Sequence, residues 1–372
     1  MLTVLGLLQA LAGWWLVRRF AAARRVRAMA VWPAVSVLKP LYGAEPLLDT
    51  ALESLCGQDY PHFQVVFGVQ DPADPALAAV ARVRARFPAC DIAVVVDDTA
   101  PGSNRKVANL MNMLPAARHD VLVVADSDVH AAPDYLRHVA AALAEPGIGL
   151  ATTLYTGLPA HPGMTGRLGA SGITHGFLPG ALLARALGRQ DALGATLALR
   201  RETLVAIGGF ATLRDELADD NVMGQRVRAL GLGIGLATTV PATTVPEASL
   251  AALFRHELRW ARTIRALSPL AFIASAVQYP LAWGVLALLF GGFEPFALAL
   301  LLGAWVGRAV AARGIDRALG IAETVAPWEL PWRDLMSLVL VLAAHGGNRV
   351  EWRGQIMRAG RVGAVEQVGV GR

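Results

Sequence analysis

The feature that most constrains the fold is an uncharged run, residues 267–290. A membrane-spanning helix needs about 20 mostly apolar residues, so this run predicts a transmembrane helix. Pro280 interrupts the run, which predicts a kink near that residue. Residues 295–312 are also apolar apart from Arg308, and only a short link containing two glycines separates the two runs. We therefore expect a hairpin of two transmembrane helices.

The N-terminal segment predicts a further membrane anchor, residues 1–27. Residues 1–17 carry no charge, and the arginines that follow are Arg18, Arg19, Arg24, Arg25 and Arg27. A secretory signal carries its positive charge before the apolar stretch, so this order indicates an uncleaved anchor. Its basic flank is expected on the cytoplasmic side.

The C-terminal part predicts one more membrane contact. Residues 335–344 form a short apolar run, a length that favours a re-entrant or interfacial helix over a full span. The tail that follows, residues 346–372, contains the basic residues Arg349, Arg353, Arg358 and Arg361. By the positive-inside rule we expect this tail to lie in the cytoplasm.

Composition supports a membrane protein. Hydrophobic residues make up 55% of the chain and charged residues 17%, whereas soluble domains have about 25% charged residues. This excludes a disordered chain, and the net charge of +5 fits an anionic membrane surface better than nucleic acid. The two cysteines, Cys56 and Cys90, are too few for a disulfide framework, which fits a reducing compartment.

Residues 33–265 have a different pattern, typical of a soluble α/β domain. Short β-branched runs at 35–38, 65–69, 92–96 and 121–125 alternate with helical stretches at 47–55, 75–86 and 106–114. This alternation predicts a parallel, doubly wound sheet. Ligands bind such sheets beyond the carboxyl ends of the strands. Neither a P-loop nor a dinucleotide-binding glycine motif follows any of these strands.

Acidic residues follow two of the predicted strands. Asp126 and Asp128 come directly after the run 121–125, and Asp71 follows the run 65–69. Two carboxylates in a D-x-D arrangement can share a divalent cation, which would neutralise a diphosphate. Asp71 could hold a nucleotide base or ribose. The alternatives are a helix cap for the D-x-D pair and an Asx-turn before Pro72 for Asp71.

A second acidic pair, Asp219 and Asp220, enters a predicted helix. One of them could be a general base that deprotonates an acceptor hydroxyl, although acids at a helix N-terminus are also favoured by the helix dipole. Lys39 and Lys106 are the only lysines among the 34 basic residues. Either could contact a phosphate, and either could be an ordinary surface lysine.

The segment that precedes the long apolar run carries a last candidate group. It reads His256-Glu257-Leu258-Arg259-Trp260. Arginine binds diphosphate through its planar guanidinium, and tryptophan is enriched at membrane interfaces. A basic flank with an aromatic anchor is the alternative reading. His175 is a single histidine that we consider for the acceptor side.

Together these residues resemble the pattern of processive-type family 2 glycosyltransferases: D, D-x-D, D and (Q/R)xxRW. More narrowly, the chain resembles the ceramide glucosyltransferase family, family 21, through the segments around Lys39, Gln58, Asp71, Asp126 and Asp220. Within that family it is most similar to bacterial hopanoid-biosynthesis glycosyltransferases. The segments that carry this closer resemblance are Asn104-Arg105-Lys106, His119-Asp120, Ala125–Asp128, Leu217–Asp220 and the decapeptide from His256 to Arg265.

The resemblance implies a GT-A fold, a bacterial inner membrane with the catalytic domain in the cytoplasm, and inverting transfer from a UDP-sugar. Asp71 would contact the uridine, and Asp126 and Asp128 would hold Mg²⁺ or Mn²⁺ with the diphosphate. Asp220 would be the base. In the hopanoid branch the donor is UDP-N-acetylglucosamine and the acceptor is bacteriohopanetetrol.

The same resemblance implies that Arg259 and Trp260 close over the diphosphate and the acceptor. The first position of (Q/R)xxRW is His256 in this chain, so a fixed hydrogen-bond donor becomes a titratable one. Arg255 could replace it only through a one-residue shift. Asp128 has no carboxylate counterpart in the animal ceramide enzymes.

Two other functions compete with this one. A ceramide glucosyltransferase would use the same chemistry with UDP-glucose and a sphingolipid acceptor. A catalytically inactive membrane scaffold or lipid-binding protein belongs to a different class, and intact Asp71, Asp126 and Asp220 argue against it.

Overall fold

A computed structural model describes residues 1–24, 29–347, 349–352, 355–359 and 365–370. Arg25 and Arg27 of the expected N-terminal flank, and Arg353 and Arg361 of the expected tail, lie outside the described residues. The chain divides into two compact units. We call Arg24–Thr156 with Arg189–Thr244 the α/β unit, and Met1–Ala23, Gly157–Gly188 and Val245–Arg372 the helical unit. Residues 157–188 and 245–265, which the sequence placed in the catalytic domain, thus belong to the helical unit.

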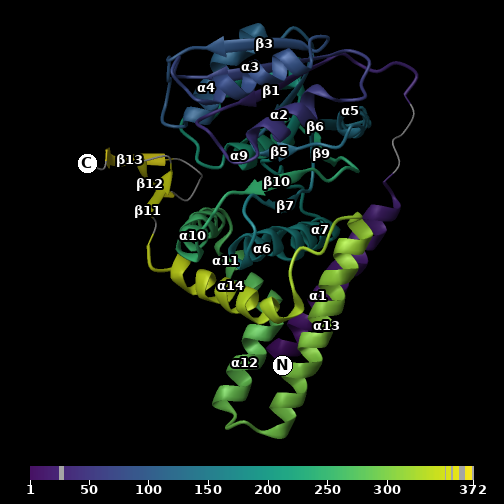
Figure 1. The fold of residues 1–372 in the computed structure, drawn as a ribbon, viewed down its shortest axis with the longest axis vertical. Helices are drawn as coiled ribbons and strands as arrows, with labels where there is room; N and C mark the ends of the chain where they lie inside the picture. Colours follow the sequence, from purple (N-terminus) through teal and green to yellow (C-terminus); the bar gives the residue numbers. More distant parts are fainter. Residues whose placement is uncertain (25–28, 348, 353–354, 360–364, 371–372) are drawn as a thin grey trace. The chain divides into compact units, whose positions relative to one another are not determined.

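The α/β unit contains a seven-stranded sheet in the order β3-β2-β1-β4-β8-β6-β9 (Figure 1). Its strands are β1 (Val35–Pro40), β2 (Phe63–Val69), β3 (Asp91–Val96), β4 (Val121–Ala125), β6 (Ile148–Thr152), β8 (Thr196–Arg200) and β9 (Gly233–Leu236). Strands β1 to β4 are parallel, as expected. Strand β8 runs antiparallel to both β4 and β6. The sheet is therefore mixed: the four predicted strands are parallel to one another, and the antiparallel β8 was not predicted.

Hydrophobic clusters cover both faces of this sheet. One cluster packs β1 through Val35 and Val37 against helices α2 (Leu48–Cys56), α3 (Ala76–Arg86) and α5 (Tyr135–Leu143). The other packs β1 through Leu38 against α4 (Arg105–Met113), α8 (Arg201–Ala206), the short helix η3 (Phe210–Leu213) and α9 (Asp219–Ala229). Side chains of a strand point alternately to its two faces, so a strand with helices on both sides is apolar throughout.

The remaining elements of the α/β unit are short. Strand β5 (Val129–His130) pairs antiparallel with β10 (Ala242–Val245), and helix η1 (Leu114–Ala116) extends α4. Strand β7 (Thr156–Pro159) is where the chain first passes from the α/β unit into the helical unit.

The helical unit contains α1 (Leu2–Ala22), α6 (Met164–Ser171), the π-helical turn η2 (Gly172–Phe177), α7 (Leu178–Ala186) and α10 (Leu250–Leu267). Further along the chain are α11 (Pro269–Ala274), η4 (Ser275–Gln278), α12 (Pro280–Phe290), α13 (Pro295–Leu319), η5 (Pro327–Glu329) and α14 (Leu330–Ala344). The tail forms β11 (Arg349–Trp352), β12 (Gln355–Ala359) and β13 (Val365–Val370). Helix α13 packs against α1 and α12, and α10 packs against α14.

Glycines allow the close approach of α1 and α13. A Cβ at Gly314 would lie 2.2 Å from the ring of Trp14, and one at Gly307 would lie 2.6 Å from Leu7. Small residues at helix interfaces let backbones approach in this way.

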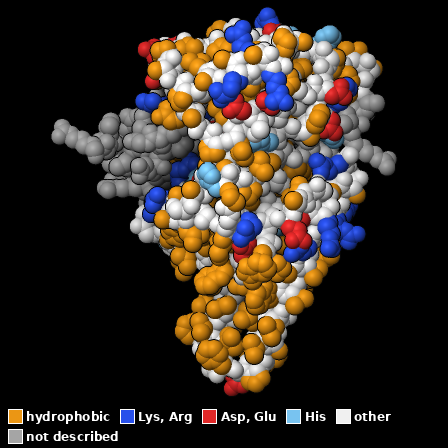
Figure 2. Space-filling model, viewed as in Figure 1, with side chains coloured by type: hydrophobic (Ala, Val, Ile, Leu, Met, Phe, Trp, Pro, Cys, Tyr) orange, Lys and Arg blue, Asp and Glu red, His pale blue; other side chains and the backbone are white. Residues whose placement is uncertain are grey.

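Within the described residues, α13 is long and apolar enough to cross a membrane. The expected single helix over 267–290 is instead a broken pair, Pro269–Gln278 and Pro280–Phe290, bent by 70°. The break falls at Pro280, where the kink was expected, because proline cannot continue the hydrogen-bond ladder. Figure 2 shows hydrophobic side chains gathered over α12 and α13, where Phe290, Phe296 and Val306 are exposed. The N-terminal anchor over α1 remains a prediction.

Candidate active site

The carboxyl ends of the central parallel strands bring the predicted residues of the α/β unit to one edge of the sheet. Strand β1 lies between β2 and β4, with Pro40 opposite Gly68 and Leu38 opposite Val124. Lys39 near the end of β1, Asp71 after β2 and Asp126 after β4 therefore share that edge. This is where ligands bind in open α/β sheets.

Lys39 is fully buried and holds the loop after β4. Its Nζ donates to the carbonyl oxygens of Asp126 at 2.8 Å and Val129 at 3.3 Å. Burial lowers the pKa of Lys39 to about 8, although Asp128 and Asp126 oppose the effect. Lys39 thus fixes the backbone that carries the D-x-D pair, and its side chain is 0% exposed.

Lys106 joins the two acidic pairs. Its Nζ lies 2.6 Å from Asp126 Oδ1 and 3.6 Å from Asp219 Oδ2. Burial alone would lower the pKa of Lys106, but Asp126 and Asp219 outweigh burial and raise it. An ammonium that stays charged between two carboxylates offsets their mutual repulsion.

Local hydrogen bonds position Lys106 at the start of α4. Asn104 caps this helix by accepting from the Val107 amide at 3.1 Å, and its side chain donates to the Glu216 carbonyl at 2.8 Å. The amide of Ser103 donates to Asp215 at 2.9 Å. The start of α4 is thereby tied to the segment that leads into α9 and its acidic pair.

Asp128 carries an unfavourable negative charge. Burial, and after it the neighbouring carboxylates Asp126 and Glu45, raise its pKa to about 7. Glu45, in the loop after β1, has a buried Oε2 with no hydrogen-bond partner among the described residues. The sequence reading missed Glu45, although it follows strand β1 much as Asp71 follows β2.

The second acidic pair begins α9. Burial raises the pKa of Asp219, and Lys106 counteracts this effect. Burial and then Asp219 raise the pKa of Asp220 to about 7, while its Oδ1 accepts from the Asn221 amide at 2.7 Å. A Cβ at Gly194 would lie 2.9 Å from Asp220 Oδ2. The absence of a side chain at Gly194 leaves room for this carboxylate, which the sequence did not indicate.

Tyr155 is another residue that the sequence reading missed. Burial raises the pKa of its phenol, and Asp220, Asp126 and Asp128 raise it further. All three carboxylates therefore act on one tyrosine that precedes β7.

Asp71 forms the Asx-turn that was the alternative reading of its position. Its Oδ1 accepts from the Ala73 amide at 2.8 Å, and the residue is exposed. Its neighbour Asp74 is buried and accepts from Gly43 at 2.9 Å and from Ala76 at 2.8 Å. Asp74 thus anchors the loop after β1, while Asp71 remains accessible.

Asp126 and Asp128 fit a divalent cation in one respect. Their hard oxygen donors suit Mg²⁺ or Mn²⁺. Burial first, and the neighbouring carboxylates second, raise the pKa of Asp128, and a bound cation would stabilise its charged form. Among the described residues, no group of three metal-binding side chains surrounds one point. Cations of this type are commonly held by one or two carboxylates, with phosphate and water completing the coordination.

The helical unit holds the remaining candidates on α10. His256 Nδ1 contacts Glu247 Oε1, and the His256 ring lies 4.4 Å from that of Trp260. The neighbouring Arg255 is exposed. The side chain that packs against Trp260 is that of His256. Glu257 receives two hydrogen bonds of 2.7 Å from Arg333 of α14.

His175 lies apart from the α10 residues, inside the helical unit. Its Nε2 is 2.8 Å from Asp316 Oδ1, and its Nδ1 is 3.0 Å from Ser171 Oγ. The side chain is 0% exposed. Both ring nitrogens of His175 therefore have partners, and a role on the acceptor side remains a prediction.

The comparisons with known proteins bear on the family and the fold of this chain. The family model described as glycosyl transferase family 21 matches residues 1–365. A ceramide glucosyltransferase of Candida albicans is 31% identical over 120 residues, covering 29% of this chain and 22% of the relative. Ceramide glucosyltransferase 1 of Caenorhabditis elegans is 22% identical over 248 residues, covering 66% of this chain and 53% of the relative. The chain thus matches about half, or less, of the length of these curated relatives.

A solved structure supports the fold. The mannosyltransferase PcManGT from Pyrobaculum calidifontis, in complex with GDP-Man and Mn²⁺, has a TM-score of 0.54 and 20% identity. The alignment covers 93% of this chain and 98% of that chain. The GT-A fold and the family resemblance inferred from the sequence are both confirmed. The chain belongs to glycosyl transferase family 21.

Proposed function

We propose that this protein is a membrane-bound, metal-dependent, inverting glycosyltransferase that moves a sugar from a UDP-sugar to a lipid hydroxyl. The observation that carries the proposal is the cluster at one sheet edge, in which Lys106 bridges Asp126 and Asp219 beside Asp220. Such a cluster offers a carboxylate for proton removal next to charges suited to a diphosphate.

In the proposed reaction the acceptor oxygen attacks the anomeric carbon as its proton passes to Asp220. The bond between that carbon and the diphosphate oxygen breaks, and UDP leaves. A single displacement inverts the anomeric configuration and needs one base and one stabilised leaving group. The pKa of about 7 suits Asp220 to this role, because a general base works best near the operating pH.

The other residues of the cluster serve the donor. Asp126 and Asp128 would hold the divalent cation, which when bound neutralises charge on the diphosphate. Lys106 adds a permanent positive charge beside Asp126. Asp71, exposed at the same sheet edge, is available to the nucleoside.

For the helical unit we propose contact with the bilayer and the lipid acceptor. The apolar surface of α12 and α13 supports insertion in a membrane. The arginine and tryptophan of α10 would act on the diphosphate and acceptor, with His256 in the first motif position. We propose a bacterial plasma-membrane location with the α/β unit in the cytoplasm, where UDP-sugars are made.

The finer proposal is transfer of N-acetylglucosamine from UDP-N-acetylglucosamine to bacteriohopanetetrol. It rests on the sequence segments from Asn104 to Lys106 and from His256 to Arg265. A second candidate, glucose transfer to ceramide, is favoured by the curated relatives, which are ceramide glucosyltransferases. The two candidates share every residue of the acidic cluster.

The test is an assay on membranes that contain the full chain. UDP-N-acetylglucosamine and UDP-glucose are each offered with bacteriohopanetetrol or with ceramide, and products are read by lipid mass spectrometry. An N-acetylhexosamine on bacteriohopanetetrol would support the finer proposal, and a hexose on ceramide would replace it with the second candidate. UDP binding without transfer in any pairing would favour an inactive lipid-binding protein.

A further inference from the structure

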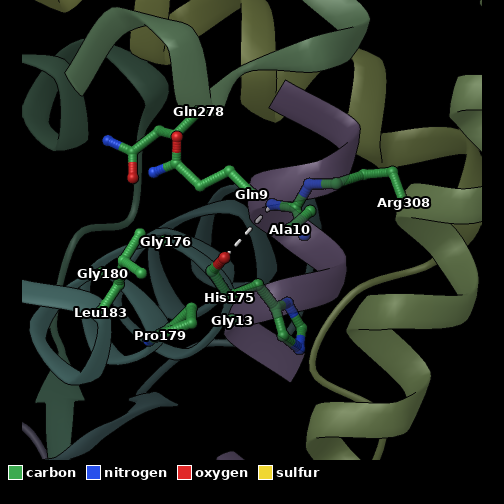
Figure 3. A pocket seen from close by; sticks show the side chains of 10 residues that line it. All are labelled: Gln9, Ala10, Gly13, His175, Gly176, Pro179, Gly180, Leu183, Gln278 and Arg308. Atoms are coloured by element: carbon green, nitrogen blue, oxygen red, sulfur yellow. Dashed lines mark hydrogen bonds between the residues drawn. The ribbon is translucent and has the colours of Figure 1, made fainter. Parts of the chain in front are cut away.

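A small pocket lies inside the helical unit, and none of the residues that line it belongs to the acidic cluster (Figure 3). It is lined by α1 through Gln9, by η2 and α7 through Gly176 and Gly180, by η4 through Gln278 and by α13 through Arg308. Four separate stretches of the chain thus meet around it. Figure 3 shows the amides of Gln9 and Gln278 and the guanidinium of Arg308 directed toward the same space.

The broken helix contributes to this pocket. Gln278 is the last residue before the 70° bend between η4 and α12. Its Nε2 donates to the Tyr279 hydroxyl at 3.0 Å, and its Oε1 faces the Gly180 side of the pocket, 3.7 Å from where a Cβ would lie. At membrane depth, interrupted helices are tolerated where they are buried in protein or line a polar cavity.

Arg308 brings a buried guanidinium to the pocket. Its side chain is 5% exposed, its Nη2 donates to the His175 carbonyl at 3.4 Å, and its Nε lies 3.6 Å from Asp334 Oδ1. The Nε side of the guanidinium therefore faces the Asp334 carboxylate. Because Asp334 balances its charge, the pocket presents donors and acceptors with little net charge. Such a site suits an uncharged polar group better than a phosphate.

The volume of the pocket and the surface of the helices around it limit the kinds of ligand that can bind. The pocket has room for about 20 Å³, whereas one water needs roughly 10–15 Å³. It can therefore take a hydroxyl or carbonyl group but no sugar ring. The helices that line it also carry exposed apolar side chains, among them Leu5 and Leu8 on α1 and Leu302 on α13. A ligand that arrives along such a surface is expected to have an apolar body.

We propose that this pocket binds the uncharged hydroxyl-bearing end of a membrane lipid. The lipid hydroxyl would exchange hydrogen bonds with the Gln9 and Gln278 amides and accept one from the Arg308 guanidinium. Two sources share this chemistry: the acceptor lipid of the proposed reaction, and a neutral lipid that stays bound. The inference does not rest on the transfer reaction, because it concerns binding alone.

The experiment uses the full chain in phosphatidylcholine nanodiscs without any UDP-sugar. The probe is a diacylglycerol with a diazirine near its free hydroxyl, and the matched probe has that hydroxyl methylated. After illumination, labelled peptides are mapped by mass spectrometry. We expect the free-hydroxyl probe to label α1 or residues 172–183 roughly five- to tenfold more than the methylated probe, the effect of losing the one hydrogen bond that the hydroxyl donates.

Two kinds of variant test the same pocket. A Cβ at Gly176 meets no atom within 4 Å, so Gly176→Leu should fill the space and abolish the preference. Gly303→Leu on α13 is the matched control, because its Cβ also meets nothing and Gly303 does not line the pocket. The double variant Gln9→Leu/Gln278→Leu should remove the preference while keeping the apolar lining.

The labelling results either support or overturn the lipid-binding proposal. Equal labelling by both probes, or a preference that survives Gly176→Leu and the double variant, would overturn the proposal and leave a pocket that holds only water. If the preference is lost in both variants but not in Gly303→Leu, competition identifies the source. Displacement by bacteriohopanetetrol or ceramide at lower concentration than by diacylglycerol indicates the acceptor, and the reverse order indicates a resident lipid.

Discussion

At the residue scale, Asp220 makes the most direct prediction. Replacing it by asparagine keeps the size of the side chain but removes the ability to accept a proton. We expect Asp220→Asn to lower kcat by about 10²–10⁴-fold, the usual contribution of a general base, with UDP affinity preserved. Calorimetric UDP titration and initial rates check this, with Asp98→Asn, an exposed acid of the same unit, as control. Equal loss of UDP binding and transfer would contradict the role as base.

The pH dependence follows from the same carboxylate. The pKa of Asp220 is raised to about 7, and a base works only when deprotonated. We therefore expect kcat/KM to rise about tenfold per pH unit below pH 7 and to level off above it. Asp128 also has a raised pKa of about 7, so apparent affinity for Mg²⁺ or Mn²⁺ should strengthen over the same interval, since protons compete with metal. Rates measured at saturating metal separate the ionisation of Asp220 from the effect of Asp128 on metal affinity. If neither kcat/KM nor metal affinity changes from pH 5.5 to 8, both assignments are contradicted.

Gly194 tests whether the position of the base matters independently of its chemistry. A Cβ at this residue would lie 2.9 Å from Asp220 Oδ2, and the carboxylate is the group free to move. Gly194→Ala should therefore lower kcat by roughly ten- to a hundredfold through misplacement, with little change in thermal stability. Gly188→Ala is a poor control because Gly188 has a φ of +92°. Gly303→Ala in the helical unit is the better control, because a Cβ there meets no atom within 4 Å. A variant with full activity would show that Asp220 need not be held in this place.

At the scale of elements, Lys106 joins α4, β4 and α9 through one ammonium group. Replacing it by methionine leaves Asp126 and Asp219 without their shared cation. We expect Lys106→Met to destabilise the protein by about 1–3 kcal/mol, less than for a fully buried ion pair, because Asp126 is partly exposed to solvent. The control is Arg105→Met, an exposed neighbour on the same helix, which should change stability by less than about 0.5 kcal/mol. Denaturant unfolding in detergent measures both, and similar values for the two variants would refute the bridging role.

The elements also show what a single sequence can predict. The runs 35–38, 65–69 and 121–125 became β1, β2 and β4, because strands covered on both faces must be β-branched and apolar. Strands β6, β8 and β9 were missed, since their sequences, such as Ile148–Thr152 and Gly233–Leu236, are rich in small residues that signal no secondary structure. The antiparallel direction of β8 depends on the long excursion of residues 157–188 into the helical unit, which no local pattern encodes.

Some residues of the candidate site could also be predicted from the sequence, and others could not. Asp126, Asp219 and Lys106 could be predicted because acids after strands and a rare lysine stand out in the sequence, and the structure brings them together. Glu45 and Tyr155 could not, because their part in the cluster arises from burial and from neighbours distant in sequence.

At the scale of the whole molecule, the membrane topology is the largest prediction still to be tested. Helix α13 has 25 residues, about 37 Å at 1.5 Å per residue, which exceeds the roughly 30 Å hydrocarbon core. Helix α12 has only 11 residues. Its arm of the hairpin can therefore cross the membrane only if the bent segment before it adds to its length. Glu294 lies at the tip between them, and a carboxylate at the bilayer centre is costly. The length of α13 and this charge favour a tip that reaches the far side of the membrane over one that stops inside it.

A single cysteine at the tip decides between these arrangements. With Cys56 and Cys90 replaced by serine, we expect Phe293→Cys, at an exposed position of the tip, to react with a membrane-impermeant maleimide in intact spheroplasts. A cysteine at the exposed Asp98 should react only after lysis, because we place the α/β unit in the cytoplasm with the UDP-sugar. Protection of Phe293→Cys in both conditions would make α12 and α13 a re-entrant hairpin. Reaction of both cysteines before lysis would put the acidic cluster on the side that lacks the donor and would refute the proposed topology.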